Sequence, residues 1–128
     1  MNEVYIHKVL KLAIYAGEIM MRSGAEVHRV EDTIMRICKA CGIKTTEVFS
    51  TPMGLFVSLD SGDLEAPTTT YIKRVRGQLT DMTKISRVNR FSREFTANAY
   101  TIDEALLKLE EIDSGRQYPK PEIGRAHV

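Results

Sequence analysis

The segment 23–33 holds a dense group of ionisable side chains: Glu26, His28, Arg29, Glu31 and Asp32. Acidic residues near the start of a helix could position the ammonium group of a substrate. His28 and Asp32 are four residues apart, so on a helix they share a face and could act as a base and the group that orients it. This segment is therefore a candidate binding or catalytic site.

The same spacing also has a structural explanation. Arg22 and Glu26 share a helix face at i,i+4, and Arg29 and Asp32 do so at i,i+3. Acidic residues in a first helical turn are also stabilising through the helix dipole. The residues alone leave both interpretations open.

A second candidate is the run Thr51-Pro52-Met53-Gly54, which separates two segments of strand character. Proline fixes one backbone dihedral and Gly54 permits a positive φ, so the run predicts a tight turn. Such a turn could present backbone N–H groups to a carboxylate. An ordinary hairpin needs the same residues, so a purely structural role is the alternative.

A third candidate is a concentration of arginines in the segment 74–93, where Asn89 and Arg90 are adjacent. An arginine fork binds carboxylates and other anions well, so this group could hold an anion or a partner's carboxylate. A surface network with Asp81 and Glu94 is the alternative. The other arginines of the group are Arg74, Arg76, Arg87 and Arg93.

A serine hydrolase could be assembled from His28, Ser58 or Ser61, and Asp32 or Asp60. The chain has no Gly-x-Ser-x-Gly elbow, and a serine in a strand or a polar turn is usually only solvated. Phosphate-loop and dinucleotide glycine patterns are also lacking, so we expect no cofactor.

Cys38 and Cys41 form a lone C-x-x-C near the end of an expected helix. Zinc needs about four ligands, and no second pair of cysteines exists. Redox pairs use the N-terminus of a helix to lower the pKa of the thiol, whereas this pair lies at the opposite end. We expect inert cysteines that pack inside the protein, and no metal site.

Bulk properties fit one globular domain with 43% hydrophobic residues in 128. The net charge of +1 gives no field that favours nucleic acid, so any binding must be local. The longest apolar stretch, 9–21, contains charges and is too short to cross a bilayer of about 30 Å. The N-terminus lacks the features of a secretory signal, and we expect a cytosolic chain.

Apolar spacing predicts helices over 3–22 and 25–41, separated by Ser23-Gly24, with Ser23 opening the second helix. Three strands follow, over 44–49, 55–59 and 68–75, and short turn signals between them favour an antiparallel sheet. A third helix follows Gly77 on an apolar stripe that includes Leu79 and Met82, and a capping box at Thr101 opens a fourth, which runs to about Ile112. The fold class is α+β, in the order ααβββαα; residues 1–115 form the domain and 116–128 a proline-containing linker.

Four segments together, 23–33, 51–59, 74–75 and 85–90, resemble the N-terminal domain of the threonine/serine exporter family over about residues 8–118. The resemblance implies a cytoplasmic domain that precedes several membrane helices, which carry export driven by the proton gradient, and some members pair two separate subunits. The sequence ends where those helices should begin, so it looks like a piece cut from a longer protein or its soluble part. The signature positions are Gly24, Glu26, Arg29, Glu31, Thr51, Pro52, Gly54, Arg74, Asn89 and Arg90.

Met53 departs from the family pattern, which has a small polar residue after the proline in many members. This departure weakens a direct contact with a hydroxylated substrate at the turn. The C-x-x-C also has no counterpart in the family pattern.

Three functions follow as hypotheses. The first is a non-enzymatic exporter domain that gates, couples or assembles a membrane-spanning region or subunit, and that could bind a small amino acid. The second is a small hydrolase or amidase that uses His28 and Asp32 with a serine. The third is a dimeric ligand sensor, for which the apolar helical hairpin offers an interface between copies.

Overall fold

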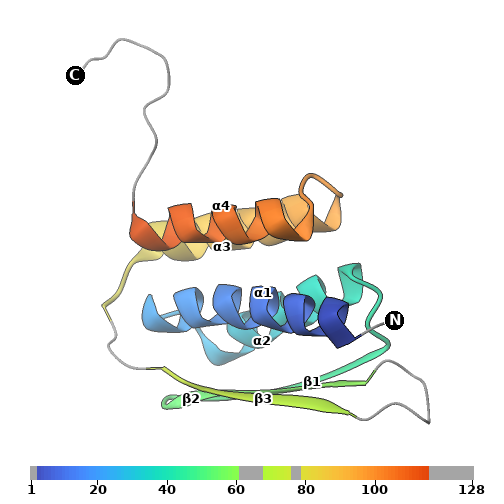
Figure 1. Cartoon of the computed structure of the whole chain (residues 1–128). Helices are drawn as coiled ribbons and strands as arrows, with labels where there is room; N and C mark the ends of the chain where they lie inside the picture. The colour runs from blue at the N-terminus through green and yellow to red at the C-terminus, as the bar shows by residue number, and fades with distance from the viewer. Residues whose placement is uncertain (1–2, 61–67, 76–78, 116–128) are drawn as a thin grey trace.

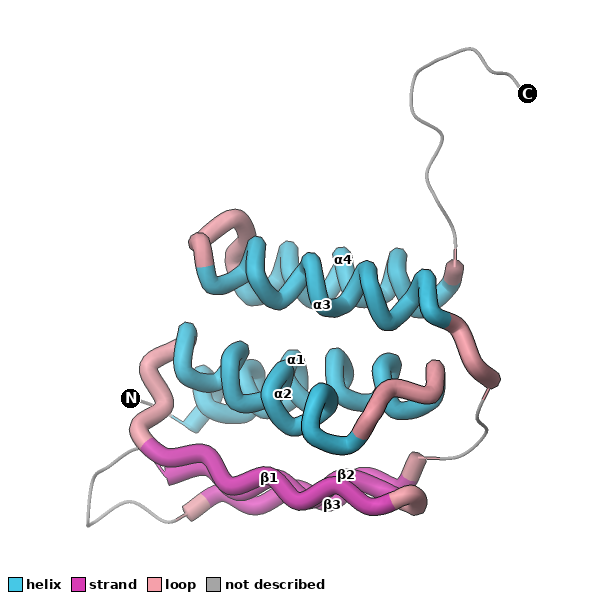
Figure 2. Tube along the Cα trace, turned by 180° about the vertical axis from the view of Figure 1, so that it is seen from behind, coloured by secondary structure: helices cyan, strands magenta, loops and turns pink. Residues whose placement is uncertain are grey.

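The computed structural model describes residues 3–60, 68–75 and 79–115. The order of elements is α1 (Glu3–Arg22), α2 (Val27–Ala40), β1 (Thr45–Thr51), β2 (Gly54–Asp60), β3 (Thr69–Arg74), α3 (Met82–Thr96) and α4 (Ile102–Ser114). The predicted α+β class and the order ααβββαα are confirmed. Figures 1 and 2 show three layers: the sheet, then α1 with α2, then α3 with α4.

Helix α1 lies in the middle layer and contacts α2, α3, α4 and β2. Eleven of its side chains or glycines are buried, more than one apolar stripe supplies. The sheet covers one side of the α1–α2 layer, and α3 and α4 cover the other side of α1, so the buried apolar residues of the hairpin pack within the domain. An interface between copies on this hairpin stays a prediction.

The connection between α1 and α2 needs Gly24, which has a positive φ of 89°. Ser23 does not open the second helix as expected: it is buried in the turn, and its carbonyl oxygen accepts a hydrogen bond from Asp81 N. The residue before α2 is Glu26, whose side chain makes no capping hydrogen bond. The turn is thus fixed by a contact with the segment that enters α3.

The sheet is antiparallel, as predicted, with strand order β1-β2-β3. Side chains alternate between its two faces. Leu55, Val57 and Leu59 of β2 are buried on the face that α1 and α2 cover. Phe56 of β2 lies on the other face and is exposed, and Figure 1 shows no helix on that side.

The outer layer consists of α3 and α4. Asp81 caps α3 by accepting from Lys84 N, and the predicted capping box of Thr101 and Glu104 is present at α4. Leu79 and Met82 are 83% and 67% exposed, so they do not belong to the buried apolar stripe as expected. Leu79 precedes α3, and Met82 is the first residue of that helix. The predicted linker 116–128 lies outside the described residues.

Candidate functional site

A polar cleft lies between α2 and α3, with a volume of about 180 Å³. Five of the candidate residues line this cleft, although about 60 positions separate those of α2 from those of α3: His28, Arg29, Asp32, Asn89 and Arg93. The cleft is completed by Thr33 and Arg36 of α2.

The cleft is strongly cationic, since Arg29, Arg36 and Arg93 face a single carboxylate, that of Asp32. Within the described part of the chain, the side chains of Arg29, Arg93 and Asp32 make no hydrogen bond and no ion pair. Guanidinium groups without partners are well suited to bind a carboxylate with two parallel hydrogen bonds. The charges of the cleft are therefore complementary to those of a small anion.

One arginine of the cleft is held in place. Arg36 Nη1 donates to Ser92 Oγ at 3.1 Å, and Ser92 Oγ donates to the carbonyl oxygen of Asn89 at 2.8 Å. Ser92 is fully buried, so this contact joins α2 to α3 beneath the cleft. Arg36 and Ser92 were not among the sequence candidates. Arg36 could have been found, because it lies one further turn along the helix face that carries Asp32.

Two other members of the polar group do not line the cleft. Glu26 is exposed, and its carboxylate lies 3.8 Å from His28 Nδ1. The expected pair of Arg22 with Glu26 is wrong, because α1 ends at Arg22 and the chain turns before Glu26; Arg22 pairs with Glu18 and Asp113 instead. Glu31 points to the sheet, where its carboxylate accepts a hydrogen bond of 3.0 Å from Ser50 N.

The hairpin turn is closed by its own side chain. Thr51 Oγ1 accepts from Met53 N at 3.1 Å and from Gly54 N at 3.2 Å, so these two N–H groups are engaged within the turn. Gly54 does not have the positive φ that we expected. A Cβ at Gly54 would lie 2.6 Å from the carbonyl oxygen of Lys73, so the close approach of β3 requires glycine.

The arginines of the segment 74–93 do not form one group. Arg93 joins Asn89 at the cleft, whereas Arg90 and Arg87 line a separate hollow on another face of α3. Arg74 lies on β3, in register with Gly54, and Arg76 lies outside the described residues. Asp81 and Glu94, the expected surface partners, are engaged with Lys84 N and Tyr100.

The geometry does not assemble a serine hydrolase from Ser58. Its hydroxyl lies 3.3 Å from Thr70 Oγ1, on the face of the sheet that points away from the helices, whereas His28 lies on α2. Ser61 is outside the described residues. The two cysteines are free and buried, and burial raises the pKa of Cys38 to about 12, which favours the neutral thiol.

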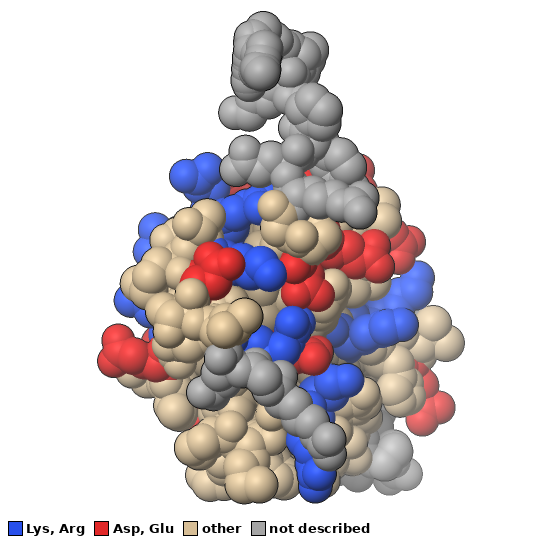
Figure 3. All heavy atoms as spheres, turned by 90° about the vertical axis from the view of Figure 1, so that its left-hand side faces the viewer, with Lys and Arg blue, Asp and Glu red and all other residues tan. Residues whose placement is uncertain are grey.

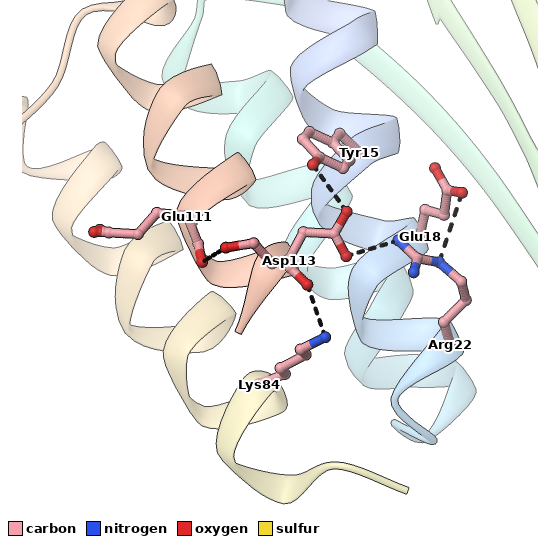
Figure 4. A network of polar contacts seen from close by, with 7 residues as sticks. Tyr15, Glu18, Arg22, Lys84, Glu111 and Asp113 are labelled. Carbon is pink, nitrogen blue, oxygen red and sulfur yellow. Dashed lines mark hydrogen bonds and ion pairs between the residues drawn. The ribbon is translucent and has the colours of Figure 1, made fainter. Parts of the chain in front are cut away.

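A network around Asp113 joins the two helical layers (Figure 4). Its carboxylate accepts from Tyr15 Oη at 2.9 Å and from Arg22 Nη2 at 3.1 Å, and its carbonyl oxygen accepts from Lys84 Nζ at 2.8 Å. Burial, followed by the hydrogen bond to Asp113, raises the pKa of Tyr15. Because three helices meet at Asp113, this network fixes their positions and was not predicted.

A larger hollow of about 510 Å³ lies between α1, β3 and α4, with an apolar floor of Leu10 and Ile14. None of the sequence candidates lines it. On the face shown in Figure 3, acidic and basic side chains of the described residues are interspersed. The α2–α3 cleft brings together five of the sequence candidates, His28, Arg29, Asp32, Asn89 and Arg93.

Comparison with known proteins gives one family. A family model described as a putative threonine/serine exporter matches residues 11–122. A curated relative from Mycobacterium tuberculosis strain H37Rv, described as a probable threonine/serine exporter, is 25% identical over 120 residues, which cover 94% of this chain and 22% of that protein. The chain thus spans about a fifth of the length of this relative, and no solved structure gives a significant match. Among the described helices, none is long and apolar enough to cross a membrane.

Proposed function

Because the chain belongs to the threonine/serine exporter family, we propose that it forms a domain on the cytoplasmic side of such an exporter and gates or couples transport. In this proposal residues 1–115 are the domain, and 116–128 lead to a membrane-spanning region or subunit that is its partner. The length of the curated relative supports the proposal, since this chain matches only 22% of it and leaves room for membrane helices.

The observation that carries the proposal is the α2–α3 cleft. A free amino acid has a carboxylate and an ammonium group on the same carbon atom. Arg29 and Arg93 offer guanidinium groups to the carboxylate, and Asp32 offers a carboxylate to the ammonium group. Ligand pockets for drug-sized molecules are about 300–1,000 Å³, so a cleft of about 180 Å³ suits a smaller ligand such as threonine or serine.

A ligand in this cleft would touch both helical layers, because Arg29 and Asp32 belong to α2 and Arg93 to α3. Binding can shift a conformational equilibrium only as far as the ligand prefers one arrangement over the other. A bridge between the two layers provides such a preference, since any movement of α3 against α2 changes the number of contacts. Through this shift in the arrangement of α2 and α3, a cytoplasmic amino acid would change how the domain acts on the membrane part.

The test is a calorimetric titration of the 128-residue chain with threonine, serine and succinate. We expect saturable binding of threonine or serine. The affinity should fall about tenfold or more in Arg29→Ala and in Arg93→Ala, because each substitution removes a charged hydrogen bond. Arg90→Ala is the matched control, since Arg90 lies on another face of the same helix. Absence of binding at millimolar ligand, or an equal loss in the control, would contradict ligand recognition at the cleft.

A second measurement tests the role in transport. The same three substitutions in the complete exporter should lower threonine export for Arg29→Ala and Arg93→Ala and leave it unchanged for Arg90→Ala, at equal amounts of protein in the membrane. Normal export in all three variants would exclude a gating or coupling role for the cleft.

A further inference from the structure

The face of the sheet that points away from the helices carries an apolar row. Phe49 of β1, Phe56 of β2 and Ile72 of β3 are in register across the three strands. They are 63%, 40% and 64% exposed, and the rings of Phe49 and Phe56 lie 6.0 Å apart. Three large apolar side chains side by side on a sheet are more than the isolated exposed residues common on protein surfaces. The row is therefore a candidate interaction surface.

Opposite charges flank the row on a diagonal. Glu47 of β1 is paired with Ser58 of β2. Ser58 lies two residues from Phe56 on the same face, toward one end of the sheet. Arg74 of β3 is paired with Gly54, one same-face position toward the other end. Neither side chain makes an ion pair with a described residue. Each lies one strand across and two residues along from Phe56, roughly 8 Å from it by the standard spacings.

This arrangement is complementary to itself. Consider a twofold axis that lies in the plane of this face, passes through Phe56 and is perpendicular to the line from Glu47 to Arg74. Rotation about this axis places Glu47 opposite Arg74 of a second copy, and Arg74 opposite Glu47 of that copy. The apolar rows would then cross at Phe56, and the strands of the two sheets would cross at a large angle, as in orthogonal sheet packing. An isologous interface has this property, since every contact occurs twice.

We propose that this outer face of the sheet is the interface of a homodimer, in which Phe49, Phe56 and Ile72 form the apolar centre and Glu47 pairs with Arg74 of the second copy. A second copy fits better than an anionic lipid surface, because such a surface would repel Glu47. The inference goes beyond the proposed function and does not depend on ligand binding in the cleft.

The size of the face sets the expected affinity. Three strands of about seven residues have a flat footprint of roughly 14 by 23 Å, or about 320 Å² per copy. A stable interface buries about 800 Å² per partner, so this dimer is a weak one. We expect a dissociation constant on the order of 100 μM for the isolated chain.

Sedimentation equilibrium of the chain, from about 10 μM to about 1 mM, tests the proposal. Ile72→Ser should weaken dimerisation about tenfold, because the substitution removes an apolar contact twice. The control is Leu107→Ser on α4, since Leu107 is 66% exposed and Ile72 is 64% exposed. Circular dichroism of each variant shows whether it is folded.

Exchange of the charges at Glu47 and Arg74 tests how the two copies are oriented in the dimer. Glu47→Arg and Arg74→Glu should each weaken dimerisation about tenfold, because each places like charges opposite each other. The double variant should restore the original dissociation constant, since the two charges are only exchanged. A chain that stays monomeric to about 1 mM, an equal effect of Leu107→Ser, or a double variant no better than the single ones would overturn the proposal. A monomer would leave the face to a different partner, such as the membrane part.

Discussion

The carboxylate of Glu31, on α2, accepts a hydrogen bond of 3.0 Å from the backbone N–H of Ser50, on the edge strand β1. An edge strand leaves part of its N–H groups without a partner in the sheet. Ser50 is buried, so without Glu31 its N–H group would lack a partner in a place that water reaches poorly. Glu31 thus joins the middle layer to the sheet.

Replacing Glu31 should lower the free energy of unfolding. Glu31→Ala leaves Ser50 N unpaired, so we expect a loss of about 1–3 kcal/mol, and a smaller loss in Glu31→Gln, which keeps an acceptor oxygen. Urea unfolding measures both. Glu26→Ala is the control, because Glu26 is exposed and caps no backbone group with its side chain. A loss in Glu31→Ala no greater than in the control would show that the hydrogen bond is not important for stability.

Substitution of Gly54 should also destabilise the domain, and for a steric reason. In Gly54→Ala the new Cβ would lie 2.6 Å from Lys73 O and 3.3 Å from Arg74 Cα, so β2 and β3 must move apart. We expect a cost of about 1–3 kcal/mol, measured by thermal unfolding. Met53→Ala, at the exposed neighbouring position, should change little. Equal melting temperatures for the two variants would refute the steric explanation.

The local features of this fold are predictable from sequence, and the contacts between layers are not. The bounds of α1, the Gly24 turn and the capping box at Thr101 follow from residues near one another in the chain. The turn residues predict glycine at position 54 for a positive φ. The structure instead requires Gly54 because β3, about 20 positions later, approaches it closely.

In the candidate site, too, the residue types are predictable from sequence and the contacts between elements are not. His28, Arg29 and Asn89 could be selected from their types, but only the packing of α2 against α3 brings them together. That packing also separates Arg90 from Asn89, although the two are adjacent, because neighbouring residues point to different faces of a helix. The Asp113 network was missed because its members come from three helices and follow no local spacing.

Alkaline pH should destabilise the domain through Tyr100. Burial, followed by the hydrogen bond to Glu94, raises the pKa of Tyr100 to about 12. The unfolded chain releases this proton near pH 10, so its contribution to stability is complete below about pH 10 and is lost as the pH rises toward 12. Urea unfolding across this range should show a weaker decline in Tyr100→Phe. An identical decline in both proteins would contradict the assignment.

The cysteines should be unreactive in the folded protein. Cys38 and Cys41 are buried, and burial raises the pKa of both thiols, so little thiolate exists at neutral pH. A thiol-specific reagent should therefore react with neither cysteine in native buffer and with both in concentrated urea. Rapid reaction of the native chain would instead indicate a reactive thiol.

Helix α1 precedes the other described elements along the chain, yet it lies between the two other layers. Its neighbours β2, α3 and α4 are completed only at Asp60, Thr96 and Ser114. On the ribosome, the apolar helix is therefore made long before the surfaces that cover it. Apolar surface that waits for its partners is prone to aggregate. The nascent domain thus depends on protection from the synthesis of α1 until α4 has emerged.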